Sequence, residues 1–577
     1  MKRFSRLYII GFLWTSLSLS AQENILTSRV LREPVQKVSE VNDANSVTTI
    51  EYYDTAGRLI QTIRKGFGPN GEDLADYIQF DEAGRIAKEY LSTPFTGNNG
   101  VFVPVSEFEQ STQTWSRTHL YEASTEGRIV ETSGMHVGGK SIKYDYRLSN
   151  SSEPELSALE FRMQNNTTIN KRMAARGAYQ VVEEIDEDGH RILLFTDSDG
   201  HTVLKRRVDG DVYHDTYMVY DAYDHLRCVL PPAAVDAYSS FDDQSLSAGN
   251  FLDLYAYFYI YDNDNQCVGV KYPGADWIYT VYDGDYRPIL SQDGNQRKRD
   301  EWSFIKYDGL GRVVIEGIVK DKRTRDDLAD IYEDVLVHEE YIGTEGPCRG
   351  YTDHIKMGQN RYILTCIRYY DNYAFTEFSS DWSFANMASS ASAKGLLTGV
   401  FEAVLNQPDK GRFTINQYDD KSRLIRRDSK ETLSNNTLSA DYSYNFSGAL
   451  IRSDSRYGNR YSLRLDYNYD HAGREKNSIC VLGYGTTHYT SPLRAFTYDS
   501  HGRISEKMMQ GNKVKMTYGY HNDGTLFNIG SMNGFNETLY FGNSMLPYQL
   551  SRCNNGNIAD ISISQGGRLY FYHFDYD

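Results

Sequence analysis

The sequence contains little proline, tryptophan and cysteine: 13 Pro, 5 Trp and 6 Cys in 577 residues. Such a low proline content excludes a collagen-like chain and a proline-rich linker. No two cysteines form a C-x-x-C pair, so no zinc site is predicted. Disulfide pairing is left open for an exported chain, and we predict no particular pair. The cysteines are Cys228, Cys267, Cys348, Cys366, Cys480 and Cys553.

Positively charged residues are also fewer than negatively charged ones. Lys and Arg total 61 against 78 Asp and Glu, which gives a formal net charge of −17. A general nucleic-acid binder needs a basic field, so nucleic acid is excluded as a partner class. Hydrophobic residues make up 40% of the chain, enough to bury a core. No stretch beyond the N-terminus reaches the length of about 18 apolar residues that a membrane span needs, so we expect none in the mature chain.

The N-terminus has the pattern of a secretory signal. Lys2, Arg3 and Arg6 precede an apolar stretch that runs from Leu7 to about Leu19, and small residues follow at Ser20 and Ala21. We predict a signal peptide at 1–21 with cleavage near Ala21. The mature protein is then expected in the periplasm, at the cell surface or outside the cell.

Tyrosine is the residue in excess, with 47 copies against 46 Gly. The dipeptide Tyr-Asp occurs 12 times and often opens the phrase Tyr-Asp-x-x-Gly-Arg, and strict and looser copies recur at spacings of 21–29 residues. Such a period indicates a repeat architecture. The clearest copies predict structural turn residues: Tyr53, Asp54, Gly57, Arg58, Phe80, Asp81, Gly84, Arg85, Tyr307, Asp308, Gly311, Arg312, Tyr469, Asp470, Gly473, Arg474, Tyr498, Asp499, Gly502 and Arg503.

Each copy predicts two strands joined by a tight turn. Alternating apolar residues flank the phrase, which is typical of half-buried strands. Asp closes an Asx-turn, and Gly supplies the positive φ that a hairpin turn requires. Arg can bind the Asp of its own or a neighbouring turn, or stack on a Tyr ring. A lone hairpin cannot bury its face, so the hairpins are expected to stack.

With these phrases the chain resembles the Rhs/YD-repeat family, and in particular secreted Bacteroidetes-type members. Other stretches that look like family phrases are 186–189, 196–200, 229–232, 290–296, 395–399 and 555–558. The resemblance implies an all-β solenoid of stacked antiparallel hairpins that forms an open spiral sheet or partial shell. It also implies a part in toxin delivery or intercellular competition. The sequence shows no match to the family's core segment or effector, so no autocleavage residues are carried over.

We therefore predict a secreted, non-enzymatic scaffold. Its expected partners are a core or effector polypeptide, or a second copy through self-association. Exposed Tyr beside Asp, Asn and Arg leaves a second hypothesis, an adhesin that binds surface glycans. A secreted hydrolase is the third and is disfavoured, because no catalytic constellation stands out.

Segment boundaries follow the repeats. We expect a polar lead-in at 22–45, N-terminal repeats with insertions at 46–175, a repeat block at 176–345, an irregular insertion at 346–400 and a C-terminal repeat block at 401–577 that ends within a repeat. Leu328, Ile331 and Val335 have helical spacing, which predicts one exposed helix within 321–338. A short helix is also expected near Pro232.

Two patterns could be mistaken for binding sites. Residues 134–141 fit G-x-x-x-x-G-K-[ST], but they are followed by strand-like alternation where a phosphate cradle needs a helix. Acidic turns at 186–189, 197–200 and 262–265 resemble parts of calcium loops, but none completes the ligand pattern. We expect these carboxylates to close turns, and we predict no catalytic, cofactor or metal residues.

Overall fold

A computed structural model describes residues 24–135, 140–164, 168–238, 244–245, 252–354, 356, 363–377, 393–405, 407–509, 511, 513–532, 537–541, 560–565 and 568–573. The predicted signal peptide and the phrase at 555–558 lie outside the described residues. No helix of the described chain is long and apolar enough to cross a membrane.

Short strands dominate the N-terminal part, as the alternating apolar residues predict. They are β1 (Asn24–Leu31), β2 (Ser46–Tyr53), β3 (Leu59–Arg64), β4 (Asp73–Phe80), β5 (Ile86–Phe95), β6 (Ser116–Tyr121), β7 (Ile129–Ser133), β8 (Ile142–Leu148), β9 (Leu159–Gln164) and β10 (Thr168–Met173).

The strands of the middle part are β11 (Gln180–Ile185), β12 (Arg191–Thr196), β13 (Thr202–Asp209), β14 (Val212–Tyr220), β15 (Leu226–Leu230), β16 (Gln244–Ser245), β17 (Tyr257–Tyr261), β18 (Cys267–Lys271), β19 (Ile278–Tyr282), β20 (Pro288–Gln292), β21 (Glu301–Tyr307), β22 (Val313–Lys320), β23 (Ile363–Asp371), β24 (Ala393–Val404) and β25 (Gln407–Tyr418).

The strands of the C-terminal part are β26 (Leu424–Glu431), β27 (Asn436–Tyr444), β28 (Leu450–Tyr457), β29 (Tyr461–Tyr469), β30 (Glu475–Tyr484), β31 (Thr487–Tyr498), β32 (Ile504–Met509), β33 (Val514–Tyr520), β34 (Leu526–Met532), β35 (Glu537–Phe541), β36 (Asp560–Gln565) and β37 (Arg568–His573).

The helices are short. The α-helices are α1 (Val105–Gln110), α2 (Pro232–Tyr238), α3 (Leu252–Tyr255), α4 (Gly294–Arg297) and α5 (Arg325–Tyr332), and the 3-10 turns are η1 (Val38–Glu40), η2 (Pro154–Leu156), η3 (Gly343–Glu345) and η4 (Ala374–Glu377). The helices expected near Pro232 and within 321–338 are α2 and α5.

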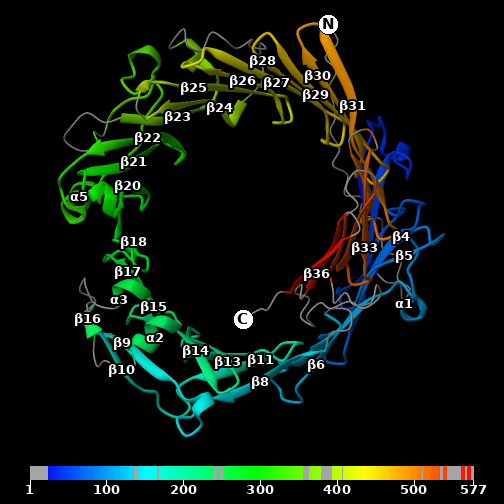
Figure 1. The fold of residues 1–577 in the computed structure, drawn as a ribbon, viewed down its shortest axis with the longest axis horizontal. Coiled ribbons are helices and arrows are strands. Elements are labelled where there is room, and N and C mark those ends of the chain that lie inside the picture. Colours follow the sequence, from blue (N-terminus) through cyan, green and yellow to red (C-terminus); the bar gives the residue numbers. More distant parts are fainter. Residues whose placement is uncertain are drawn as a thin grey trace.

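A single antiparallel sheet of 34 strands runs through the described chain, and its strands pair in sequence order. The chain leaves this sheet for β9 and β10, which form a small separate sheet with β16, and β8 then pairs directly with β11. The ribbon curves into a ring (Figure 1). Within the described residues, β1 pairs with β2 and β37 pairs with β36, so the sheet is not closed. The predicted all-β fold of antiparallel hairpins in an open spiral sheet is confirmed.

Insertions cover the sheet where its face is apolar. Three hydrophobic clusters are buried there, and each includes a residue from a helix: Phe108 of α1, Tyr238 of α2 and Leu328 of α5. In Figure 1, α1, α5 and the β9–β10 hairpin lie on the outer side of the ring. The core therefore lies between the curved sheet and its insertions.

The C-terminal part of the sheet is a single layer. Among the side chains described between 416 and 530, Ala440 is the one hydrophobic side chain that is buried. One face carries ion pairs across strands, such as Arg452 with Asp466 and Arg426 with Asp441. The other face carries exposed apolar and aromatic side chains. The alternation predicted from the sequence is present here, but no insertion among the described residues covers it.

Two predicted segments differ from the structure. The polar lead-in expected at 22–45 contains β1, which pairs with β2 along its whole length, from Asn24 opposite Tyr53 to Leu31 opposite Ser46. Its side chains are mostly exposed, so the strand lacks the apolar alternation that would have identified it. The irregular insertion expected at 346–400 contains β23 and the first residues of β24, and both strands belong to the main sheet.

After one circuit the C-terminal turns meet the N-terminal part. We call this contact the seam. The His471 ring nitrogen lies 2.8 Å from the Gly66 carbonyl oxygen, and Asn522 donates to the Thr112 carbonyl at 2.7 Å. The ring nitrogen of His501 lies 3.2 Å from the Gln113 carbonyl oxygen. Figure 1 shows the same proximity, with β31 and β33 beside β4 and β5. Side chains of turns, not strand pairing, bring the ends of the spiral together.

Candidate functional site: the turn ladder

The turn after β21 shows the geometry of a strict repeat. Asp308 accepts the backbone N–H groups of Leu310 and Arg312 on one carboxylate oxygen, each at 2.9 Å. The other oxygen accepts Arg312 Nε at 2.7 Å. Gly311 has φ +78° and donates its N–H to the Asp308 carbonyl at 2.9 Å. Asp, Gly and Arg thus close one loop together, which explains their fixed offsets.

The other predicted turn residues lie in the same arrangement. The distance from the Asp carboxylate to Arg Nε is 2.7–2.8 Å in all four, and the Gly φ lies between +79° and +81°. The backbone N–H of Arg58 is the main cause that lowers the pKa of Asp54 below its ordinary value, and Arg85 does the same for Asp81. These pairs are Asp54 with Arg58, Asp81 with Arg85, Asp470 with Arg474 and Asp499 with Arg503.

A Tyr or Phe from the next repeat stacks on each Arg. The Arg guanidinium carbon lies 4.2 Å from the Phe80 ring centroid for Arg58, 4.4 Å from Tyr370 for Arg312 and 4.3 Å from Tyr498 for Arg474. Cation–π contact of this kind stabilises the stacked pair. The sequence left open whether Arg would bind Asp or stack on Tyr, and the same Arg does both.

The Tyr hydroxyl completes the link between repeats. It donates to the carbonyl of the residue that follows the stacked Arg: Tyr121 to Ile86 at 2.8 Å, Tyr307 to Pro288 at 2.7 Å and Tyr498 to Glu475 at 2.6 Å. Burial raises the pKa of Tyr307 and of Tyr498. Sequence reasoning missed this acceptor, although a Tyr that recurs one repeat after each Arg is its signal. We call the chain of Asp–Arg turns and Tyr rings the turn ladder.

Looser repeats keep the backbone but change the residues. The position of the turn glycine is taken by Asp224, Asn265, Tyr286 and Ser422, each with a positive φ between 59° and 66°. His replaces Arg at His201 and His225, and these rings stack on Tyr220 and Tyr261 at 4.6 and 4.5 Å. The fold therefore imposes the turn even where its preferred residues are absent.

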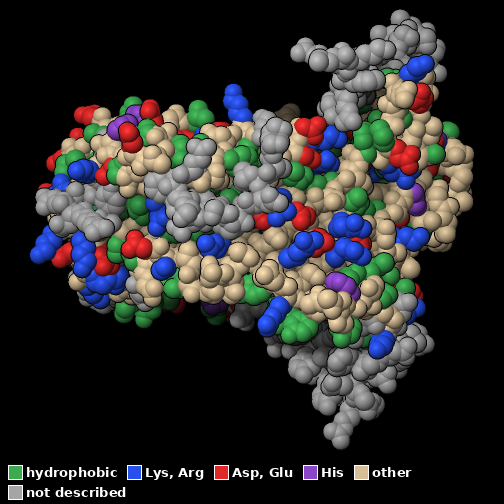
Figure 2. Space-filling model, turned by 90° about the horizontal axis from the view of Figure 1, so that it is seen from above, with side chains coloured by type: hydrophobic (Ala, Val, Ile, Leu, Met, Phe, Trp, Pro, Cys, Tyr) green, Lys and Arg blue, Asp and Glu red, His purple; other side chains and the backbone are tan. Residues whose placement is uncertain are grey.

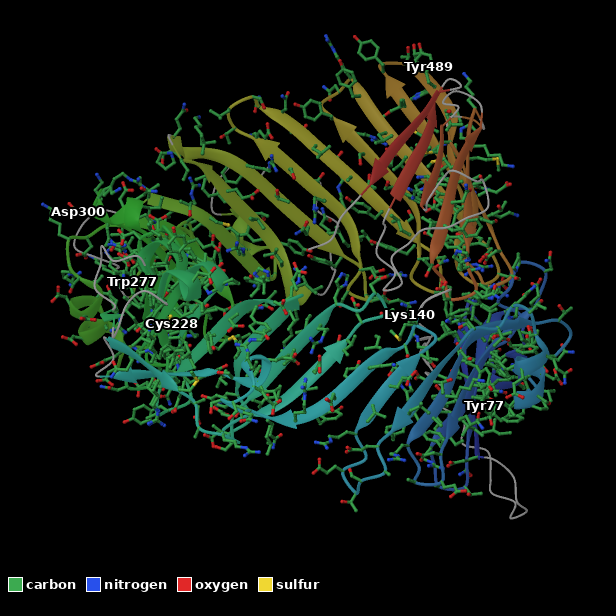
Figure 3. All side chains as sticks on the ribbon, turned by 60° about the horizontal axis from the view of Figure 1, so that its bottom comes forward. Tyr77, Lys140, Cys228, Trp277, Asp300 and Tyr489 are labelled. Carbon is green, nitrogen blue, oxygen red and sulfur yellow. The ribbon has the colours of Figure 1, made fainter. Side chains whose placement is uncertain are left out.

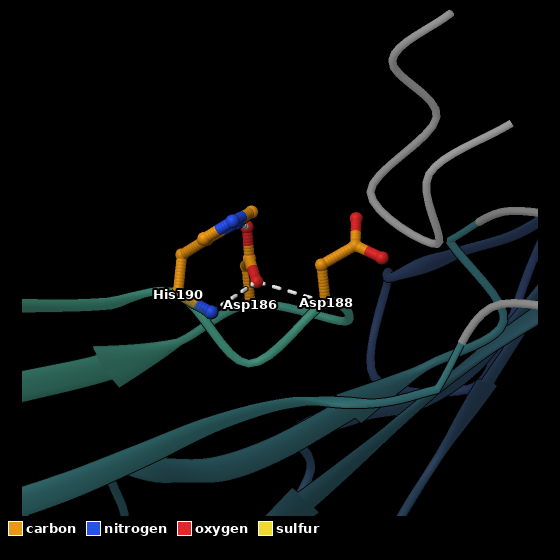
Figure 4. Close-up of side chains that lie close together, drawn as sticks. All are labelled: Asp186, Asp188 and His190. Carbon is orange, nitrogen blue, oxygen red and sulfur yellow. Dashed lines mark hydrogen bonds and ion pairs between the residues drawn. The ribbon is translucent and has the colours of Figure 1, made fainter. Parts of the chain in front are cut away.

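The acidic turns that resembled calcium loops belong to the turn ladder. The ligand atoms of Asp186, Asp188 and His190 lie within 4.8 Å of one another. However, Asp186 already accepts the backbone N–H groups of Asp188 and His190 and lies 2.9 Å from the His190 ring nitrogen. Figure 4 shows the Asp188 carboxylate turned away from the other two side chains. The arrangement matches turn closure by Asp186.

The phosphate-cradle pattern at 134–141 is followed by β8, a strand, where such a cradle needs a helix. Residues 136–139 of the pattern lie outside the described residues. Gly134 has φ +78°, and an added Cβ would lie 2.1 Å from the Ser116 carbonyl oxygen. The close approach of this backbone explains why a glycine stands here. Lys140 of the same pattern is exposed (Figure 3).

The described cysteines do not have the features of reactive thiols. Cys228, Cys267, Cys366 and Cys480 are free thiols, and Cys228 and Cys348 are buried. Burial raises the pKa of the Cys228 and Cys366 thiols, the latter to about 11, which disfavours the reactive thiolate.

Four exposed tyrosines lie together on the single-layer part of the sheet. Tyr457, Tyr461, Tyr484 and Tyr489, which we call the aromatic row, are 45–66% exposed. Tyr461 stands directly opposite Tyr457 on one side and Tyr484 on the other, and the Tyr461 and Tyr484 ring centroids lie 5.3 Å apart. Tyr489 lies at the rim of the C-terminal strands (Figure 3). On the face in Figure 2, acidic and basic side chains are interspersed without a large region of one sign.

Comparisons with known proteins agree with this architecture. Residues 27–147 match the model of a family described as a domain of unknown function, DUF6443. A comparison with curated protein sequences gave no significant match.

Solved structures share the fold at low sequence identity. The chain is similar to the TcdB2-TccC3-Cdc42 crystal structure, with a TM-score of 0.61 and 12% identity over 94% of this chain and 23% of that one. It is similar to TcdB2-TccC3 without its hypervariable C-terminal region, with a TM-score of 0.60 and 12% identity over 94% and 22%. It also matches a Photorhabdus luminescens Tc holotoxin pore, with a TM-score of 0.60 and 12% identity over 93% and 22%.

The chain thus spans under a quarter of the length of the chains it matches. At 12% identity these comparisons show a shared β fold.

Proposed function

We propose that this chain is an exported, non-enzymatic Rhs/YD-repeat scaffold that resembles the shell part of a toxin-delivery or intercellular-competition protein. The observation that carries the proposal is the single spiral sheet, which completes a circuit and meets itself at the seam. A curved sheet of this kind can surround or present another polypeptide. The structures that contain TccC3 support the comparison with a toxin shell.

The residues most prominent in the sequence are used for architecture. Asp and Arg close turns, and the ladder Tyr rings and hydroxyls are engaged with the neighbouring repeat. These contacts support a scaffold. The excess of Tyr in the composition then reflects the number of repeats and not a reactive centre. We also propose that the chain is related to the secreted Bacteroidetes-type members of this family.

The test is co-expression with the polypeptide encoded directly downstream. If the chain is a shell, this polypeptide co-purifies with it and resists a protease that degrades it when it is expressed alone. An unrelated polypeptide of equal length serves as the control and stays sensitive. Equal degradation of the downstream product with and without the chain would reject the shell function.

Export is tested separately in cell fractions. The expected product is found outside the cytoplasm and begins at Gln22, near the predicted cleavage site. A cytoplasmic product that retains Met1 would contradict export.

The aromatic row supports a second candidate function, binding of surface glycans. Tyrosine rings can stack on sugar faces, and this row lies exposed on a surface that no described insertion covers. Glycan-array binding that is lost in a Tyr461→Ala/Tyr484→Ala variant would favour this adhesin. The control is Tyr223→Ala, because Tyr223 is 79% exposed and lies outside the row. No array signal, or equal loss in both variants, would reject it.

A further inference from the structure

One lysine is fully buried beside the hydrophobic cluster that includes Leu328 of α5. Lys306 is on β21, where its side chain is 0% exposed and its cross-strand partner is Ile315 of β22. Ile315 and the strand neighbour Phe304 belong to that buried cluster. A buried ammonium loses its hydration, so it needs close charged or polar partners.

Two carboxyl groups from one insertion reach this lysine. Lys306 Nζ lies 2.7 Å from Glu339 Oε1 and 2.6 Å from Asp353 Oδ1. The Glu339 side chain is 0% exposed and that of Asp353 is 15% exposed. The Lys306 amine, the Asp353 carboxyl group that can react with it and the Glu339 carboxyl group that can carry protons thus lie together in a buried place.

The second carboxyl group, Glu339, is held firmly in position. Its Oε2 accepts the Thr352 hydroxyl at 2.6 Å and the His354 backbone N–H at 2.9 Å. Its own backbone N–H donates to the Tyr307 carbonyl at 2.7 Å. These bonds leave Oε1 directed at the lysine. A fixed acid–base group within hydrogen-bond reach of a reacting nitrogen is what proton transfer requires.

From this geometry we infer that Lys306 and Asp353 condense to an intramolecular amide cross-link, with Glu339 as the proton carrier. Glu339 takes a proton from the Lys306 ammonium, and the free Nζ attacks Cγ of Asp353. Glu339 passes this proton to an Asp353 oxygen, takes a second proton from the nitrogen after the attack and passes it to the same oxygen; the new C–N bond thus replaces one C–O bond and one water leaves. Ammonium plus carboxylate gives neutral amide plus water, so atoms and charge balance and no co-reactant is needed.

Burial and position favour this step over a lasting ion pair. Condensation removes two charges from a site where each is costly to desolvate. It also profits from reacting groups that the fold already holds in contact. The product would tie the insertion at 333–354, which has little regular structure, to the centre of the sheet. The amide would be a covalent cross-link that needs no cysteine.

The test is the mass of the denatured wild-type chain. The expected mass is lower than that of the processed sequence by one water molecule. Tryptic digestion is expected to yield a branched peptide that joins the segment around Lys306 to the segment around Asp353. A full-length mass without this loss, together with two separate linear peptides, would overturn the inference and leave a buried ion cluster.

Variants and an internal control sharpen the result. Glu339→Gln and Lys306→Arg are each expected to abolish the branched peptide and restore the missing water. Lys271 is the control within the same sample, because it is also buried and lies 3.4 Å from an Asp253 carboxylate oxygen. Its peptide is expected to stay linear, and a branched Lys271 peptide would show that burial beside a carboxylate suffices without Glu339. The wild-type measurement decides the inference whether or not the variants fold.

Discussion

The guanidinium of Arg474 stacks on Phe67, a residue of the first repeats, with 4.9 Å between the guanidinium carbon and the ring centroid. The same guanidinium also stacks on Tyr498 of its own neighbouring repeat at 4.3 Å. An added Cβ at Gly502 would lie 2.8 Å from the Phe67 ring, so this ring is packed closely into the C-terminal turns. Phe67 therefore extends the turn ladder across the seam.

Replacement of Phe67 by Ala is expected to loosen the seam. A cation–π contact at a partly exposed site contributes about 0.5–1 kcal/mol, so local opening becomes up to about fivefold more frequent. Hydrogen exchange in the turns at 470–474 and 499–503 measures this change.

The matched control is Phe446→Ala. Phe446 has a cation–π partner in Lys421, at 5.0 Å, but lies within the single-layer sheet. Faster exchange at the seam in the control, or unchanged exchange in the Phe67 variant, would contradict this role.

Acidification is expected to weaken the same seam through His501. Burial, and next the positive Arg503, hold the pKa of His501 below its ordinary value of 6.5. The unfolded chain therefore binds a proton more readily than the folded one, and stability falls as pH drops below 6.5 towards the folded pKa. Unfolding by urea at a series of pH values measures the slope.

His501→Gln keeps a donor for the Gln113 carbonyl but removes the titration. The pH slope of the variant is expected to be smaller than that of the wild type over this window. Equal pH slopes of stability in the variant and the wild type would show that other histidines cause the loss of stability on acidification.

Turn chemistry predicts opposite effects for two substitutions. Tyr286 has φ +59° and is 56% exposed, so Tyr286→Gly relieves a left-handed backbone that costs about 1–2 kcal/mol in a non-glycine residue. Part of this gain, about 0.4–1 kcal/mol, is offset by the greater freedom of glycine in the unfolded chain. A net gain in the free energy of unfolding of about 0.5–1 kcal/mol is expected.

Gly311→Ala supplies the reverse experiment. No atom lies within 4 Å of an added Cβ there, so its positive φ alone sets the cost, and a loss of about 1 kcal/mol is expected. Urea titration compares both variants with the wild type. Changes of the same sign would reject the common turn geometry.

The turn could be predicted because its physics is local. Asp54, Gly57 and Arg58 lie within five residues, so their offsets in the sequence encode the hydrogen bonds directly. Alternation on both sides of such turns then gives antiparallel strands, and their repetition gives a long sheet.

Contacts that depend on the whole circuit left no pattern in the sequence. His471 meets Gly66 only because the number of strands and the twist of the sheet bring them together. β1 is an edge strand with mostly exposed side chains, so it lacked an apolar pattern. Lys306 lies 33 residues from Glu339 and 47 from Asp353 in the chain, and nothing local distinguishes that lysine from a solvated one.

The hydroxyl in the turn ladder is tested by Tyr498→Phe. The ring and its stacking on Arg474 remain, but the bond to the Glu475 carbonyl at 2.6 Å is lost, which is expected to cost about 0.5–1.5 kcal/mol. Tyr484→Phe is the control, because that ring is 54% exposed. Urea titration measures both, and an equal effect would argue against the link.

Alkaline pH probes the same hydroxyl with a defined sign. Burial raises the pKa of Tyr498 above its ordinary value of 10.0, so the unfolded chain loses this proton first. The stability that the half-buried neutral phenol contributes is full below 10.0 and declines as pH rises through the folded pKa. Tyr498→Phe is expected to lessen that decline, and an unchanged alkaline slope would show that other groups govern it.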